Sequence, residues 1–335
     1  MGDAGALLVV APNWLGDAVM ALPAIADLTR HFAERRLIVA ARSSVSALFT
    51  MVRDVDEVVA ANVSAIRQAA PEIAVLFPNS FASAWLVRRA AVPQRWGYAA
   101  DLRTRLLTRA VCRSKEPMHQ GAYYQHLVGE LGVAKGPLEP RIDIPEDALE
   151  AARTLLRQHG WSEGRRLVVL APGAAYGKAK QWIPSYVTQL ISDLVRERAM
   201  ICALVGSRGD AETTRAIRDA APKECQPGIV DLAGATTLPM LAAVLTMAVA
   251  CVSNDSGAMH LAAAAGVPVV GIFGSTNEKA TSPLAHRGVA TDVLTHPVWC
   301  RPCMLRECPI DHRCMSGIEP TRVMAAVDRV ARVTA

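Results

Sequence analysis

The chain has 335 residues, of which 51% are hydrophobic and 20% are charged, and its formal net charge is +5. The length indicates about two domains, and the composition indicates a compact protein with a substantial core. A net charge this small does not support binding to nucleic acid, and we expect no such partner.

Neither a membrane span nor a signal peptide is expected from the sequence. The longest apolar run, 238–252, contains Pro239 and Thr246 and ends at Asn254-Asp255, which is typical of a core helix leading into a strand. The N-terminal residues lack the basic region and the cleavable apolar region of a signal peptide. We therefore expect a cytoplasmic protein.

The first part of the chain alternates apolar strands with amphipathic helices. The periodicity predicts strands at 6–11, 36–40 and 73–77, and helices at 18–31, 82–91 and 148–159. A turn-rich segment follows, and the pattern restarts with strands at 167–170, 200–205 and 228–231 and helices at 184–198 and 211–221.

Two successive series of strands and helices predict an α/β protein with two doubly wound, Rossmann-like domains. We place them at residues 1–160 and 161–318. The final segment, 319–335, contains a helix at 320–333 that could return to pack on the first domain. The cleft between two such domains is a natural place for a ligand.

The first candidate site follows the first strand, in Asn13-Trp14-Leu15-Gly16-Asp17. A carboxylate at the carboxyl edge of a leading parallel strand can act as a general base for a sugar hydroxyl. The positive end of the next helix would keep Asp17 ionised at neutral pH. The alternative is an acid that serves only the helix dipole.

An arginine-rich segment lies at 88–113. Arginines bind carboxylate and phosphate groups in bidentate fashion, so this segment is consistent with an anionic acceptor or a membrane surface. A solvated helix face explains part of the pattern equally well.

The second domain opens with a glycine loop that contains Gly173, Ala174, Lys178 and Lys180. Its glycines permit close backbone contacts, and its lysines offer mobile positive charge for a diphosphate. A solvated loop lysine is the alternative for either lysine alone.

The stretch 253–260 combines a polar loop with the start of a small-residue helix. Unpaired N–H groups at such a helix start bind phosphate well. Asp255 or Ser256 can cap the helix, Gly257 lets a ligand approach the backbone, and His260 lies one turn further along. The alternative is a helix cap without a ligand.

Four cysteines lie close together near the C-terminus, with His296 and His312 nearby. Thiols at this spacing in a reducing compartment suggest a structural zinc site, although the spacing is irregular. Reduced thiols or disulfides that shape the loop are the alternatives, and an iron–sulfur cluster has no other support. The four are Cys300, Cys303, Cys308 and Cys314.

Neither Gly-x-Gly-x-x-Gly nor a Walker A sequence occurs, which argues against a NAD-dependent dehydrogenase and a P-loop ATPase. Four stretches instead resemble the ADP-heptose:lipopolysaccharide heptosyltransferases of glycosyltransferase family 9. They are Asn-Trp-Leu-Gly-Asp at 13–17, Leu-Phe-Pro-Asn-Ser-Phe at 76–81, Lys-Gln-Trp at 180–182 after Pro-Gly-Ala, and Ser-Asn-Asp-Ser-Gly-Ala-Met-His at 253–260. The second stretch most resembles heptosyltransferase II.

The resemblance implies a GT-B fold, with two domains facing a central cleft, and inverting transfer of heptose from ADP-heptose to the first heptose of the inner core. Asp17 would be the catalytic base, and Lys180 would neutralise the diphosphate. No cofactor would be required for catalysis. Other donor contacts would come from Gly173, Ala174, Asp255, Ser256, Gly257 and His260, and acceptor contacts from Asn79, Ser80, Arg103 and Arg105.

The implied acceptor is heptosyl-Kdo2-lipid A, so the resemblance also implies peripheral contact with the inner face of the inner membrane. One departure concerns the ribose, which a glutamate holds in some relatives. Here Asp210 is the candidate substitute. Heptosyltransferase I or another family member with a different acceptor is the leading alternative, followed by a sugar-nucleotide epimerase and a non-enzymatic binding protein.

Overall fold

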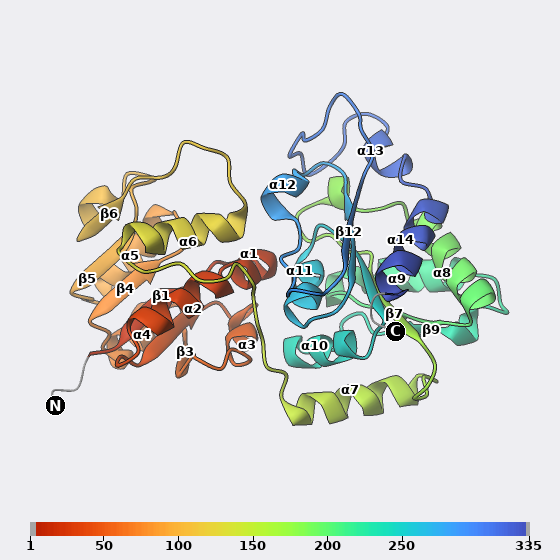
Figure 1. The fold of residues 1–335 in the computed structure, drawn as a ribbon, viewed down its shortest axis with the longest axis horizontal. Helices are drawn as coiled ribbons and strands as arrows, with labels where there is room; N and C mark the ends of the chain where they lie inside the picture. The colour runs from red at the N-terminus through yellow and green to blue at the C-terminus, as the bar shows by residue number, and fades with distance from the viewer. Residues whose placement is uncertain (1–4, 333–335) are drawn as a thin grey trace. The chain divides into compact units, whose positions relative to one another are not determined.

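The computed structural model describes residues 5–332. It divides into two compact units, Met1–Asp143 and Ile144–Ala335. Each unit is built on its own six-stranded parallel sheet with flanking helices (Figure 1). Within residues 5–332, no helix has both the length and the apolar composition that a membrane crossing requires.

The first unit has the strand order β3-β2-β1-β4-β5-β6. Its strands are β1 (Leu7–Val10), β2 (Leu37–Ala41), β3 (Glu57–Ala60), β4 (Ile73–Leu76), β5 (Gln94–Tyr98) and β6 (Arg109–Val111). Its helices are α1 (Leu15–Met20), α2 (Leu22–His31), α3 (Ser46–Phe49), α4 (Val63–Ala69), α5 (Phe81–Arg89), the 3-10 turn η1 (Thr104–Leu106) and α6 (Gln120–Glu130).

The second unit has the order β12-β11-β10-β7-β8-β9. Its strands are β7 (Leu167–Ala171), β8 (Ile201–Leu204), β9 (Ile229–Asp231), β10 (Ala250–Asn254), β11 (Val269–Phe273) and β12 (Thr291–Thr295). Its α-helices are α7 (Glu146–Gln158), α8 (Pro184–Arg198), α9 (Ala211–Ala220), α10 (Leu238–Thr246), α11 (Gly257–Ala264), α12 (Glu278–Thr281), α13 (Arg313–Ser316) and α14 (Pro320–Arg332). Its 3-10 turns are η2 (Lys178–Lys180), η3 (Arg208–Asp210) and η4 (Gln226–Gly228).

Both sheets have the same topology when their strands are counted along the chain. The strand order is 3-2-1-4-5-6 in each unit, which is the order of a doubly wound dinucleotide-binding fold. The prediction of two Rossmann-like domains is therefore confirmed. In such sheets the order reverses between the first and fourth strands, and ligands bind beyond the carboxyl ends at that point. These positions are β1/β4 in one unit and β7/β10 in the other.

The central strands are buried along their whole length, because helices cover both faces of a parallel sheet. In the first unit, alternate residues of β1, β2 and β4 pack with Ile66 of α4 and Val87 of α5. In the second unit, the corresponding cluster joins Val168 and Val252 to Leu190 of α8 and Val327 of α14. Such continuous apolar strands are what made the sheet predictable.

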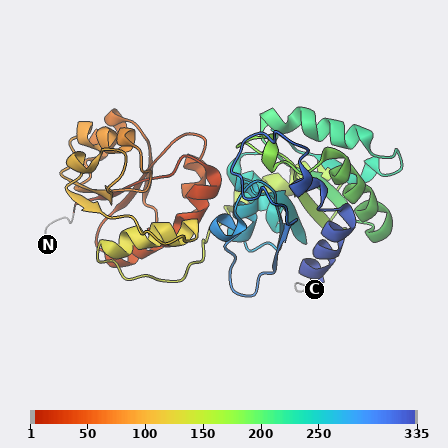
Figure 2. The ribbon, with the colours of Figure 1, turned by 90° about the horizontal axis from the view of Figure 1, so that it is seen from above.

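The observed boundary between the units differs from the predicted one near residue 160. Helix α7 packs on α10 through an apolar stripe that includes Ala152 and Leu156, so it belongs to the second unit. Helix α14 packs within the second unit, against α8, β10 and β11. Figure 2 shows the blue α14 beside the green α8. Val333, the predicted end of this helix, lies outside the described residues.

The N-terminal helix and the arginine-rich segment also differ from prediction. The helix predicted at 18–31 is two helices, α1 and α2, which meet at Ala21, where Pro23 in the first turn of α2 lacks the N–H that a continuous helix needs. Beyond α5, the arginine-rich segment forms strands β5 and β6 with a 3-10 turn between them. Most of these arginines therefore do not lie on one helix face.

Arg103 was predicted to contact the acceptor, but its side chain is fully buried, so this prediction is corrected. Its Nε donates to the Tyr98 carbonyl at 2.9 Å, and its Nη1 donates to Ser83 Oγ at 3.0 Å and to the Pro78 carbonyl. Burial lowers the pKa of Arg103 to about 10. Arg103 therefore holds the turn between β4 and α5 against the end of β5, whereas Arg105 is exposed.

Replacement of Arg103 should destabilise the first unit. Arg103→Met leaves buried carbonyl and hydroxyl acceptors without their donor, so we expect the free energy of unfolding to fall by about 3 kcal/mol. Urea denaturation followed by circular dichroism measures the loss. Arg105→Met, an exposed neighbour, should change stability by less than about 0.5 kcal/mol. Equal effects of the two substitutions would show that the buried contacts of Arg103 are unimportant.

Candidate functional site

Asn254, the last residue of β10, organises the switch point of the second unit. Its carboxamide is 2% exposed. Its Nδ2 donates to the carbonyls of Pro172 at 2.7 Å and Gly173 at 3.3 Å, and its Oδ1 accepts from the backbone N–H of Trp182 at 3.0 Å. One side chain thus ties both ends of the loop that follows β7 to the end of β10.

Lys180 and Asp255 form an ion pair beside this amide. Lys180 Nζ lies 2.7 Å from Asp255 Oδ2, and the two side chains are 15% and 6% exposed. The ammonium also lies 4.9 Å from the centre of the Tyr176 ring. Two residues predicted to bind the donor are therefore in direct contact, although 75 positions separate them in the sequence.

Helix α11 begins immediately after Asp255, with Ser256 as its N-cap. Ser256 Oγ bonds to Ser253 Oγ at 2.9 Å and does not cap the helix. The first-turn N–H groups of a helix have no partner within the helix, and such groups bind phosphate at helix starts. His260 is buried, and its Nε2 lies 3.9 Å from Asp255 Oδ1. The His260 ring therefore lies beside the Asp255 carboxylate.

Gly173 lies against Asp210, at the ends of β7 and β8. A Cβ at Gly173 would stand 2.3 Å from Asp210 Oδ1, so a larger residue there would require the Asp210 side chain to move. Asp210 Oδ2 accepts from the backbone N–H of Ser207 at 2.8 Å and from Ser207 Oγ at 2.7 Å. The Asp210 carboxylate, the candidate for the ribose contact, is thus fixed next to the glycine loop. Ala174 follows Gly173 in this loop.

In the first unit, Asp17 and Asn79 follow the neighbouring strands β1 and β4. Asp17 lies in the first turn of α1. Burial, and secondarily the charge of Asp17, raise the pKa of Tyr124 well above its usual range. Asn79 Nδ2 donates to the hydroxyl of Tyr123 at 2.8 Å, and the exposed Ser80 caps α5. Helix α6 thus supports both site residues.

Sequence reasoning did not identify the tyrosines of α6 or the role of Asn254. The signal for the first was an adjacent pair, Tyr123-Tyr124, in a chain with only 5 tyrosines. The signal for Asn254 was its place between the last apolar residue of a strand and the helix cap. Neither signal specifies the partner, because the partners come from distant segments.

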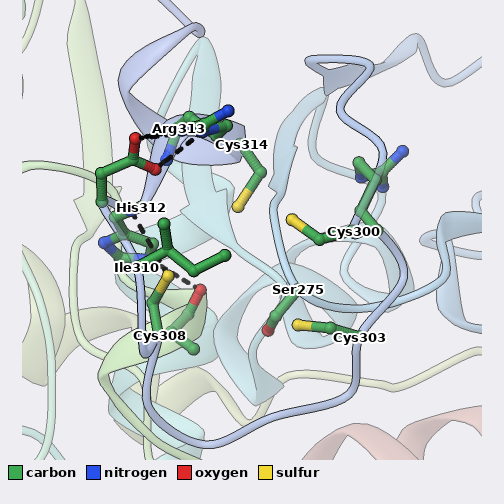
Figure 3. Close-up of a pocket in the computed structure, with 11 residues that line it drawn as sticks. Ser275, Cys300, Cys303, Cys308, Ile310, His312, Arg313 and Cys314 are labelled. Atoms are coloured by element: carbon green, nitrogen blue, oxygen red, sulfur yellow. Dashed lines mark hydrogen bonds and ion pairs between the residues drawn. The ribbon is translucent and has the colours of Figure 1, made fainter.

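The four clustered cysteines line one pocket together with Ser275 and His312 (Figure 3). All are free thiols, so the disulfide alternative is not realised in this structure. Within residues 5–332, no three His, Cys, Asp or Glu side chains are already placed to hold a metal ion. Burial and the neighbouring sulfurs raise the pKa of Cys314. Zinc at this pocket stays a prediction.

The family model and the curated relatives that this chain matches belong to the same family. The model of "Glycosyltransferase family 9 (heptosyltransferase)" matches residues 59–313. Lipopolysaccharide heptosyltransferase 2 of Salmonella typhimurium is 28% identical over 313 residues, which cover 86% of this chain and 88% of that protein. The Escherichia coli K12 protein of the same name is 27% identical over 314 residues, with the same coverage.

Solved structures agree with this result. The structure of E. coli ADP-heptose LPS heptosyltransferase II is 26% identical, with a TM-score of 0.83 and 98% of both chains covered. A family 9 glycosyltransferase from Veillonella parvula is 18% identical with a TM-score of 0.84, again over 98% of both chains, and supports the fold alone. Because the family model covers well over half of the sequence, this chain belongs to glycosyltransferase family 9, the heptosyltransferase family, and has its GT-B fold.

Proposed function

We propose that this enzyme transfers L-glycero-D-manno-heptose from ADP-heptose to the first heptose of the lipopolysaccharide inner core, as a heptosyltransferase II. The observation that carries the proposal is the partly buried contact of Lys180 with Asp255 at the start of α11. A cation and a row of backbone N–H groups at one point form a site for a diphosphate. The curated relatives named above support the choice of sugar and acceptor.

The donor site stabilises the leaving group. The diphosphate of ADP-heptose takes the first-turn N–H groups of α11 and the ammonium of Lys180, with Gly173 and Ala174 close to the phosphates. Positive charge fixed where negative charge develops lowers the barrier to departure of ADP. We infer that Asp210 bonds the ribose. Lys180 and the helix supply the charge, so the proposed mechanism uses no cofactor.

Asp17 is the proposed general base. Its carboxylate takes the proton of the acceptor hydroxyl while that oxygen bonds to the anomeric carbon of the heptose. The bond between this carbon and the phosphate oxygen breaks, and its electron pair leaves with ADP. Attack opposite the leaving group inverts the anomeric configuration. Placement of Asp17 in the first turn of α1, where the helix end is positive, favours its ionised form.

The acceptor is lipid-linked, and the surface around Asn79, Ser80 and Arg105 suits it. Phe81 and Trp85 are each 47% exposed with stacked rings, and Leu102 is 95% exposed. Exposed arginines surround them in the sequence, and such a mixture of apolar and basic groups favours an anionic membrane surface. We therefore propose a cytoplasmic enzyme in peripheral contact with the inner leaflet. The arginines are Arg88, Arg89, Arg105 and Arg113.

Loss of the base should abolish transfer without loss of donor binding. In Asp17→Asn, we expect kcat to fall by roughly 10²–10⁴-fold, because the acceptor hydroxyl loses its proton acceptor, while ADP affinity stays unchanged. The rate of transfer is measured as ADP release, and ADP affinity is measured by calorimetry. Asp54→Asn, an exposed acid of the same unit, is the control. Full turnover by Asp17→Asn would refute the proposed mechanism.

Lys180 should matter for the donor, whereas its neighbour Lys178 should not. Lys180→Met removes a charged donor to the diphosphate, so we expect ADP to bind roughly 10–100-fold more weakly and transfer to slow. Lys178→Met is the matched control, since Lys178 is exposed in the same 3-10 turn. Equal ADP affinities for the two variants would remove Lys180 from the donor site.

The acceptor decides the sub-type. In the presence of EDTA, we expect ADP release from ADP-heptose with heptosyl-Kdo2-lipid A and little release with Kdo2-lipid A or without acceptor. Release with Kdo2-lipid A alone would make the enzyme a heptosyltransferase I. Conversion of the nucleotide-sugar without any acceptor would indicate an epimerase. Binding of ADP without turnover on either acceptor would indicate a different acceptor or a binding protein.

A further inference from the structure

The cysteine pocket is a built site that the proposed transfer reaction does not use. It is formed by the segment between β12 and α14, where Cys314 is 7% exposed and the other three cysteines are half-buried. Figure 3 shows the sulfur atoms of Cys300, Cys303, Cys308 and Cys314 around the same space. Four sulfurs from a short stretch of chain therefore converge on one enclosed space.

Hydrogen-bond donors converge on the same space. Ser275 is 1% exposed and lines the pocket, and its Oγ has no partner among the described residues. Such a buried hydroxyl costs about 1–3 kcal/mol unless an acceptor is present. The backbone N–H of His312 donates to Cys308 Sγ at 3.3 Å. Donors of this kind surround thiolate ligands of metals and hold them in place.

We propose that Cys300, Cys303, Cys308 and Cys314 bind one zinc ion as thiolates, and that this ion fixes the loop that carries Lys180. Four thiolates match the soft, tetrahedral coordination that zinc takes in structural sites. The sulfurs must move closer than they stand here, since no three ligands within residues 5–332 already have metal-binding spacing. Side-chain rotation and the exposed residues between Cys303 and Cys308 allow that movement.

The cysteine segment packs directly on the glycine loop of the donor site. The backbone N–H of Ala179 donates to the Arg306 carbonyl at 2.9 Å, and the hydroxyl of Tyr176 donates to the Met304 carbonyl at 2.9 Å. His312 Nε2 lies 2.9 Å from the Ala179 carbonyl. The residue after Ala179 is Lys180, so the backbone that carries this ammonium is held from both sides by the cysteine segment.

Gly177 shows how close the two segments are. A Cβ at this position would lie 2.4 Å from the Arg306 carbonyl oxygen. The guanidinium of Arg306 lies over the Tyr176 ring, at 5.3 Å from its centre, and Lys180 lies over the same ring. A metal that fixes the cysteine segment would thus pre-organise the diphosphate site. This second part of the proposal rests on the proposed function, whereas the metal site does not.

Metal content tests the site itself. The full chain, purified under reducing conditions, should contain about one zinc per molecule by mass spectrometry of the metal, and Co²⁺ substitution should give the intense visible absorption of a tetrahedral thiolate site. Cys308→Ser should lose most of the metal, while Cys112→Ser, an exposed cysteine of the first unit, should keep it. A metal-free wild-type chain that takes up no Zn²⁺ or Co²⁺ when reduced would overturn the proposal, as would iron in place of zinc or disulfides in the native chain.

ADP affinity tests the coupling. Removal of zinc by a chelator should weaken ADP binding about 10-fold, and added Zn²⁺ should restore it in the wild-type chain but not in Cys308→Ser. Gly177→Ala is a second variant that perturbs the contact with Arg306 and leaves the cysteines intact, so it should keep zinc and lose ADP affinity. Circular dichroism checks that each variant is folded.

The two parts of the proposal fail in different ways. Zinc bound by the four cysteines, with the same ADP affinity before and after its removal, would overturn the coupling and leave the metal site. Failure of the wild-type zinc-loaded chain to bind ADP at all would overturn the proposed donor site and leave the metal result unaffected.

Discussion

The carboxamide of Asn254 is the constraint on which the candidate donor site depends. It satisfies the backbone at both ends of the glycine loop, at Pro172 and Trp182, from the last residue of a fully buried strand. A buried amide is favourable only when its donors and acceptors are paired, so the loop cannot leave without a cost of about 1–3 kcal/mol for each unpaired group. Lys180 lies between the two anchored ends, so the attachment of the loop to the sheet restricts where its ammonium can lie.

The two sheets use one topology for different chemistry. Each has the order 3-2-1-4-5-6, and in each the candidate residues follow the first and fourth strands, where the order reverses. In the first unit this point carries an acid, Asp17, supported by aromatic residues of α6. In the second it carries a cation at a helix start. A base and an anion site are the complementary groups that a glycosyl transfer without a covalent enzyme intermediate requires.

The fold, and the position of the candidate donor loop and helix start, could be predicted from the sequence because their signals are local. Apolar runs such as 167–170 are buried on both faces, and the helix start at 255–257 follows directly from strand and cap residues. Strands β5 and β6 were not predicted, since they carry Gln94, Arg95 and Arg109 and lie toward an edge of the sheet. The burial of Arg103 was also not predictable, because two groups that accept its hydrogen bonds, the Pro78 carbonyl and the Ser83 hydroxyl, lie 25 and 20 positions away in the sequence.

The ion pair at the candidate donor site shows how a partly buried lysine can be held in place before a diphosphate binds. Without Asp255, an ammonium that is 15% exposed would lose hydration without compensation, and the side chain would turn to solvent. Asp255 holds it at the start of α11 with a single carboxylate, which carries less charge than a diphosphate. In the proposed mechanism, the incoming phosphates take over the ammonium and the helix N–H groups together, while His260 remains beside Asp255. Binding in this proposed mechanism exchanges one charge partner of Lys180 for another.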